Sequence, residues 1–139
     1  NIVLQSPVVN PKARDCDLAG CGYFGADRRG HEKHKGLDII ALPFTKISVP
    51  ISGVVRTLFV YENSSETRGI EIANGNIKVK LFYVSTNLTT GQKVKVGDFL
   101  GLAQDVAAYH NSLGKMTPHV HMELFINNVA VDPKTYFNL

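Results

Sequence analysis

From about residue 37 onward, the chain consists of short runs of β-branched and aromatic residues separated by turn residues. This pattern is typical of an all-β domain, because such side chains fit the pleated, half-buried surface of a sheet. Asn74-Gly75 predicts a hairpin turn, and Asn127-Asn128 separates two strand-like runs in the same manner. We therefore expect mainly antiparallel pairing. The expected strands are Lys46–Val49, Gly53–Tyr61, Gly69–Ala73, Ile77–Ser85, Phe99–Ala103 and His119–Ile126.

Residues 1–30 lack any such period and contain two prolines, both cysteines and a glycine-rich stretch. We expect an ordered but irregular N-terminal arm. One segment, Asp105–Asn111, has a plausible helical pattern, and it is short. With 139 residues, no internal repeat and no linker-like tract, the chain is predicted to form a single domain over residues 1–139.

The composition excludes some classes of function. No apolar run approaches the roughly 18 residues that cross a bilayer, so membrane insertion is not expected. The net charge of +3 comes from basic residues scattered among acidic ones, and no basic run interleaves with aromatics as nucleic-acid binding would require. Scattered charges usually form a solvated surface, although weak attraction to an anionic surface, such as a bacterial wall or a sulfated glycan, fits them too.

The two cysteines, Cys16 and Cys21, close a very small loop. A zinc ribbon would need a second Cys or His pair at matching spacing, and none is present, so we predict a local disulfide. Asn63-Ser-Ser and Asn87-Leu-Thr are glycosylation sequons, which agree with an oxidising compartment. These features favour a secreted, extracellular protein. No signal peptide is visible at Asn1, so a secreted chain would begin after the cleavage site.

The run His119-Val-His-Met-Glu-Leu-Phe-Ile alternates polar and apolar residues. In a strand, His119, His121 and Glu123 share one face and the intervening apolar side chains occupy the other. Two histidines separated by one residue point to the same side only in an extended backbone, because on a helix they would lie about 200° apart around the axis. The spacing and the predicted strand therefore support each other.

A second cluster, His34-Lys-Gly-Leu-Asp38, places an imidazole and a carboxylate four residues apart, in a loop running into a strand. Together with one imidazole from the distant strand they form an N/N/O ligand set that suits zinc, with ligand distances of about 2.0–2.2 Å. Three protein ligands leave one position for water. A lone histidine is more often a surface or hydrogen-bonded residue, and we place His31 and His110 in that class.

These motifs resemble those of the lysostaphin-type zinc endopeptidases, which carry H-x-x-x-D and H-x-H. The resemblance spans most of the chain, in the same order, and implies a duplicated-hybrid-motif sheet of the peptidase-barrel type. It also implies that His34, Asp38 and His121 bind zinc, while His119 stands beside the metal as general base or transition-state stabiliser. The further matching segments are Val49-Pro-Ile-Ser-Gly-Val-Val, Val94-Lys-Val-Gly-Asp-Phe-Leu-Gly, Thr117-Pro-His-Val-His-Met-Glu and Val131-Asp-Pro-Lys-Thr-Tyr.

Active members of this family use one more histidine, and the resemblance places Tyr83 at that position. A phenol with a pKa near 10 stays protonated at neutral pH, so it donates a hydrogen bond to an oxyanion but is a poor proton shuttle. Losing one such donor reduces the rate about 10²–10³-fold in well-studied hydrolases. The alternative role of Tyr83 is packing with Val79 and Leu81, which would share its strand face by alternation.

Within the family, the chain is most similar to the chemotaxin-2-like branch of secreted animal proteins. The likeness lies in Asp15-Cys-Asp-Leu-Ala-Gly-Cys-Gly and Lys78-Val-Lys-Leu-Phe-Tyr-Val. It implies a zinc-binding protein that acts by recognition in cell signalling or innate immunity, with a cell-surface receptor or a microbial wall glycan as partner. One alternative is an active zinc endopeptidase that cleaves glycine-containing peptides such as peptidoglycan cross-links. Another is a carrier-type β-barrel with incidental histidines.

Overall fold

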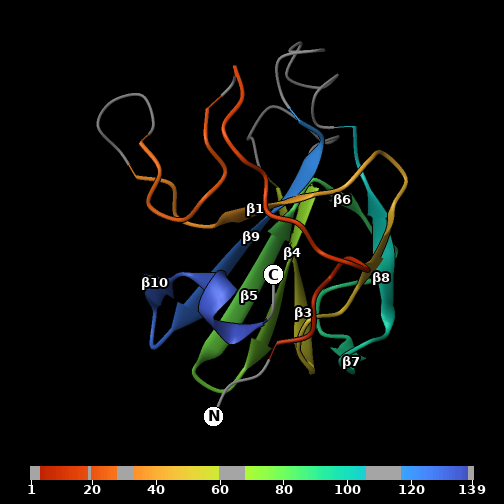
Figure 1. Cartoon of the computed structure of the whole chain (residues 1–139). Helices are drawn as coiled ribbons and strands as arrows, with labels where there is room; N and C mark the ends of the chain where they lie inside the picture. The colour runs from red at the N-terminus through yellow and green to blue at the C-terminus, as the bar shows by residue number, and fades with distance from the viewer. Residues whose placement is uncertain (1–3, 19, 28–32, 60–67, 106–116, 138–139) are drawn as a thin grey trace.

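The computed structural model describes residues 4–18, 20–27, 33–59, 68–105 and 117–137. Within these ranges the chain forms two antiparallel sheets and one short 3-10 helix (Figure 1). The larger sheet has the strand order β1-β9-β5-β4-β3-β7, with β10 also pairing with β9, and the smaller has the order β2-β8-β6. The predicted all-β, antiparallel fold is confirmed. The elements are β1 (Leu37–Ile40), β2 (Lys46–Ser48), β3 (Gly53–Phe59), β4 (Arg68–Asn74), β5 (Ile77–Phe82), β6 (Val84–Ser85), β7 (Lys93–Val94), β8 (Phe99–Ala103), β9 (His119–Ile126), β10 (Val129–Val131) and η2 (Pro133–Tyr136).

The expected strands are present with small differences at their ends. The run Ile77–Ser85 was expected to be one strand, and this was wrong: it is divided into β5 and β6. The break falls at Tyr83, whose φ of 69° lies in the left-handed region and cannot continue an extended strand. The expected helical segment, after Asp105, lies outside the described residues.

Both predicted hairpin turns are present. β4 ends at Asn74 and β5 begins at Ile77, and these two residues pair with each other. The loop between them is therefore Gly75-Asn76, one residue later than expected. Gly75 has a φ of 60°. β9 and β10 are joined through Asn127 (φ 52°) and Asn128 (φ 65°). A type I′ turn needs positive φ at both central residues, which asparagine tolerates better than most side chains.

The hydrophobic core lies between the two sheets and includes buried side chains from both. In β1 and β9 the registers Leu37 to Met122 and Ile39 to Val120 place four almost fully buried residues in this core. Because side chains alternate along a strand, the residue between each pair faces the opposite side of the sheet. The register therefore sets Asp38 directly beside His121 on that opposite face.

The N-terminal arm covers the outer edge of β1. Lys12 accepts a backbone hydrogen bond from Ile40, Arg14 donates one to Asp38, and Asp38 donates one to Gly22, all between 2.8 and 2.9 Å. These bonds satisfy edge groups that would otherwise be open to pairing with another chain. The arm is irregular, as expected, and its predicted disulfide between Cys16 and Cys21 is formed. No helix among the described residues is long and apolar enough to span a membrane.

Candidate metal centre

Three side chains that were predicted to ligate zinc converge in the structure. Nδ1 of His121 lies 2.8 Å from Oδ1 of Asp38 and 3.0 Å from Nε2 of His34, and Nε2 of His34 lies 3.3 Å from the same carboxylate oxygen. Asp38 and His121 are neighbours on β1 and β9, and His34 enters from the loop before β1. Segments more than eighty residues apart thus present three donor atoms to one point.

The second nitrogen of each imidazole is fixed by a hydrogen bond. Nδ1 of His34 donates to the carbonyl of Tyr23 at 2.9 Å, since a carbonyl oxygen can only accept. Nε2 of His121 donates to the carboxylate of Glu123 at 2.8 Å. In the singly protonated imidazoles that a bound cation requires, these bonds keep the proton on the outer nitrogen, so that Nε2 of His34 and Nδ1 of His121 face the centre, the arrangement that orients metal-ligating histidines.

Asp38 is held from both sides. Its Oδ1 faces His34 and His121, whereas its Oδ2 accepts a hydrogen bond from Arg14 at 2.7 Å and lies 3.4 Å from Nε2 of His119. The Asp38 side chain is buried. One carboxylate oxygen is therefore held by Arg14, and the other points toward the two imidazoles of the candidate metal site.

The electrostatics of Asp38 and the neighbouring histidines follow from this burial. Burial by itself would raise the pKa of Asp38, but hydrogen bonds from His121 and His34, together with the positive charge of His121, hold that pKa well below its usual range. Burial would lower the pKa of His121, but Asp38 and Glu123 raise it to about 9. For His119, burial prevails over the attraction of Asp38 and lowers the pKa. A neutral imidazole at His119 is a competent proton acceptor.

His119 stands beside the three donors rather than among them. Its Nδ1 donates to the carbonyl of Thr117 at 2.8 Å, so that Nε2 points toward the site. Tyr83 contacts the same histidine, with ring centroids 5.8 Å apart. The alternative expectation, that Tyr83 shares a strand face with Val79 and Leu81 by alternation, is wrong because β5 ends at Phe82.

Gly36, within the His34–Asp38 segment, is required by close approach to β9. A Cβ atom on Gly36 would lie 2.3 Å from the carbonyl oxygen of Met122 and 2.9 Å from Cε1 of His121. Any larger residue would push the loop away from His121. The short segment between the two ligands is thus adapted to the strand that supplies the third.

The donor set fits a zinc ion. Tetrahedral zinc with bonds of about 2.0–2.2 Å separates its ligand atoms by about 3.4 Å. The three donor atoms here are 2.8, 3.0 and 3.3 Å apart, so outward shifts of a few tenths of an ångström would accommodate the ion. Two imidazoles and a carboxylate also match the N/N/O chemistry of three-ligand zinc sites, which leave a coordination position open.

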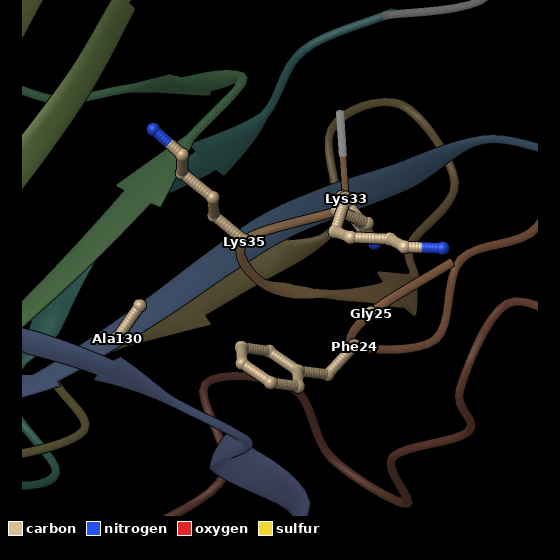
Figure 2. A pocket seen from close by; sticks show the side chains of 6 residues that line it. Phe24, Gly25, Lys33, Lys35 and Ala130 are labelled. Carbon is tan, nitrogen blue, oxygen red and sulfur yellow. The ribbon is translucent and has the colours of Figure 1, made fainter. Parts of the chain in front are cut away.

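A pocket of about 530 Å³ adjoins His34 (Figure 2). Figure 2 shows the ring of Phe24 on one side of it, with the side chains of Lys33 and Lys35 extending away from each other. Lys33 is paired with Asp27. The pocket therefore combines an apolar wall with cationic side chains next to a candidate metal ligand. Its lining residues are Phe24, Gly25, Lys33, His34, Lys35 and Ala130.

Two residues of the site were not assigned a role from the sequence. Glu123 was placed on the histidine face, but its bond to His121 was not foreseen, although their spacing on one strand could have suggested it. Arg14 had no signal, because an irregular arm has no period from which a contact with Asp38 could be inferred.

The antiparallel sheet and the loop before β1 together gather two imidazoles and a carboxylate, which defines a β protein with a candidate metal site. The model of peptidase family M23 matches residues 32–133. The chain belongs to peptidase family M23. The lysostaphin-type resemblance of its motifs is thereby confirmed at the level of the family.

Comparisons with individual proteins agree. The chain is 35% identical over 92 residues to Myeloid protein 1 of Gallus gallus, across 63% of this chain but only 28% of that protein's length. The antimicrobial peptidase lysostaphin from Staphylococcus simulans has a similar structure, with a TM-score of 0.65 and 22% identity over 91% of this chain and 50% of that one. A zinc-containing peptidase from Vibrio cholerae gives a TM-score of 0.65 and 20% identity over 94% of this chain and 39% of that one. At these identities the two structures show the shared fold.

Proposed function

We propose that this protein is a secreted, zinc-binding protein of the chemotaxin-2 type. In this proposal it acts by recognising a cell-surface receptor or a microbial wall glycan, without strong peptidase activity. One observation carries the proposal: a converged donor set of His34, Asp38 and His121 is combined with Tyr83 beside His119. The metal-holding part of a peptidase site is present, while a phenol occupies the position where a proton-shuttling imidazole would serve hydrolysis.

Zinc in this proposal is mainly structural. His34 precedes β1, Asp38 lies on β1 and His121 on β9, so an ion bound by all three would join the arm-side loop to the sheet. Binding free energy at such a site adds directly to folding free energy. The hydrogen bonds from His34 to the Tyr23 carbonyl and from His121 to the Glu123 carboxylate support this role. They hold both imidazole rings in the orientation that metal binding requires.

The recognition role is supported by the pocket beside His34. Lys35 provides a cationic group, Lys33 provides a second one that already pairs with Asp27, and Phe24 provides an apolar wall. Anionic groups carried on a sugar or peptide would match this combination. Secretion is supported by the Cys16–Cys21 disulfide, since such bonds persist in oxidising environments.

The decisive experiment measures zinc content and thermal stability together. We expect one zinc per chain after purification without chelator. Removing an ion held at a free concentration 100 times its Kd should cost about 2.7 kcal/mol and lower the Tm by about 10 °C. Restoring zinc should restore the Tm. An equal Tm after verified zinc removal would refute the structural role of the ion.

The second candidate function is a zinc endopeptidase for glycine-containing peptides, and the position of His119 favours it. Bound zinc would lower the pKa of a coordinated water and polarise the scissile carbonyl. His119, kept neutral by burial and with Nε2 directed at the site, could accept a proton. The phenol of Tyr83 could donate one hydrogen bond to an oxyanion. A peptidoglycan and oligoglycine cleavage assay tests this function, and the His119→Ala variant should then lose any activity seen.

A further inference from the structure

Arg14 reaches from the N-terminal arm into the candidate metal centre. Its side chain is only 3% exposed, and its Nη1 donates to Oδ2 of Asp38 at 2.7 Å. The backbones are joined as well, since the Arg14 N–H donates to the Asp38 carbonyl at 2.8 Å. Gly22 closes this contact: a Cβ atom there would lie 2.7 Å from the Arg14 carbonyl oxygen and 3.0 Å from Cβ of Asp38. The arm and β1 are therefore fitted together at this ligand.

Three further hydrogen bonds of the guanidinium go to a small turn that the disulfide closes. Nε and Nη2 of Arg14 donate to the two carboxylate oxygens of Asp17 at 2.9 and 2.7 Å, and Nη2 also donates to the Gly20 carbonyl at 3.1 Å. Asp17 and Gly20 exchange two backbone hydrogen bonds between Cys16 and Cys21. This bidentate ion pair between Arg14 and Asp17 fixes both the position and the plane of the guanidinium group.

The same Asp17 carboxylate is also linked, through Thr117, to His119. Its Oδ2 accepts a hydrogen bond from the Thr117 backbone N–H at 2.8 Å, and the Thr117 carbonyl accepts one from Nδ1 of His119. A turn of the arm thus contacts Asp38 through Arg14 and His119 through Thr117. These arm residues precede the segment, residues 32–133, that matches the peptidase family.

We propose that Arg14 is a positioning residue for the metal centre, held in place by Asp17 and the disulfide-closed turn. Arg14 engages Oδ2, so that Asp38 presents Oδ1 as a single ligand oxygen beside His34 and His121. The positive charge of Arg14 would by itself weaken the binding of a cation at this site. The fixed orientation that Arg14 gives the Asp38 carboxylate strengthens binding and opposes that effect. Loss of partners that orient metal ligands typically weakens binding 10–100-fold. This inference rests on the zinc binding proposed above.

The test is a chelator-competition titration that gives the zinc Kd of the wild type, Arg14→Ala and Asp17→Asn. We expect the Kd of both variants to rise about 10–100-fold. Asp15→Asn is the matched control, because it removes an exposed carboxylate from the same stretch and should leave the Kd unchanged. Circular dichroism and thermal unfolding in EDTA establish that each metal-free variant is folded before its Kd is compared.

Two further measurements follow the coordination by Asp38 and the contribution of the disulfide-closed turn. Co²⁺ in place of zinc reports coordination number through its visible absorption, and Arg14→Ala should weaken that absorption as Asp38 turns to bind through both oxygens. The double substitution Cys16→Ser with Cys21→Ser opens the turn that carries Asp17. It should therefore raise the zinc Kd, as Asp17→Asn is expected to do.

The outcomes distinguish this inference from the function on which it rests. A wild type that binds no zinc removes the proposed zinc site itself. A wild type that binds zinc, with folded Arg14→Ala and Asp17→Asn variants that bind it equally well or more tightly, overturns the role of Arg14 alone. If Arg14→Ala does not fold, the Kd of Asp17→Asn, which keeps the size of the side chain, decides the matter.

Discussion

The ring of Tyr83 stands edge-on to the ring of His119, with centroids 5.8 Å apart and an interplanar angle of 88°. Tyr83 has a φ of 69°, in the left-handed region where most side chains are rare and histidine is enriched. An imidazole at this position would therefore face His119 without added backbone strain. The site is one substitution away from a pair of histidines beside the candidate metal ligands.

The first prediction concerns this position. Tyr83→His should raise cleavage of oligoglycine and peptidoglycan peptides by about 10²–10³-fold over the wild type, because it replaces a poor proton shuttle with a group that titrates near neutral pH. The measurement is the initial rate of peptide cleavage with zinc present. Because Tyr83 is half-buried and packs against His119, the smaller imidazole should lower the Tm by a few degrees at most.

Two controls make this result interpretable. Tyr83→Phe removes the hydroxyl and keeps the ring, so it should show no gain. Adding His119→Ala to Tyr83→His should abolish the gained activity. A Tyr83→His variant that binds zinc, folds and remains as inactive as the wild type would show that the site lacks more than one histidine.

Glu123 supports the second prediction. Its carboxylate accepts the Nε2–H of His121, so Glu123→Gln replaces a charged acceptor by a neutral amide. The zinc Kd should rise about tenfold, at the low end of the range for residues that orient metal ligands. The comparison is Glu71→Gln, which removes a different carboxylate of the larger sheet, one that is buried and pairs with Arg56. Equal zinc affinity in Glu123→Gln and the wild type would contradict this role.

Gly36 gives the third prediction. Gly36→Ala places a Cβ atom 2.3 Å from the Met122 carbonyl oxygen and 2.9 Å from the His121 ring, so the loop must shift. We expect a loss of about 1–3 kcal/mol in unfolding free energy, as for other overpacked sites, and weaker zinc binding. Urea unfolding with and without zinc measures both. Lys35→Ala, at the exposed neighbouring position, should leave stability unchanged, and a Gly36→Ala variant as stable as Lys35→Ala would refute the argument.

Much of the fold could be predicted because its signals are local. Alternation over residues 119–126 placed His121 opposite the core, and Asn127-Asn128 provided the positive φ values of a turn. The break at Tyr83 could not be predicted in this way, because the run from Ile77 has strand-forming residues throughout and the left-handed φ is imposed by tertiary structure. The strand propensity of individual residues does not indicate where tertiary contacts will break a strand.

The candidate site likewise contains residues that local sequence spacing predicts and contacts that it does not predict. The spacing within His34–Asp38 and within His119–His121 is local, and it indicated the donors that the structure brings together. The contact of Arg14 with Asp38 joins an irregular arm to a strand, and only the folded chain determines it. Pairs between a loop and a sheet have no period in the sequence, so the partners that orient the donors were the part that could not be foreseen.

The last prediction concerns recognition through the pocket beside His34. Lys35→Glu should weaken binding to an anionic glycan such as heparin several-fold, because it reverses a charge at the pocket, and the difference should shrink as salt screens exposed charges. Lys95→Glu is the matched control: it changes the net charge by the same amount from an exposed position next to β7, at the opposite edge of the sheet from β1. Affinity measured by salt elution and by titration should fall for Lys35→Glu and stay near wild type for Lys95→Glu. Equal losses in the two variants would mean that net charge, rather than the pocket, governs binding.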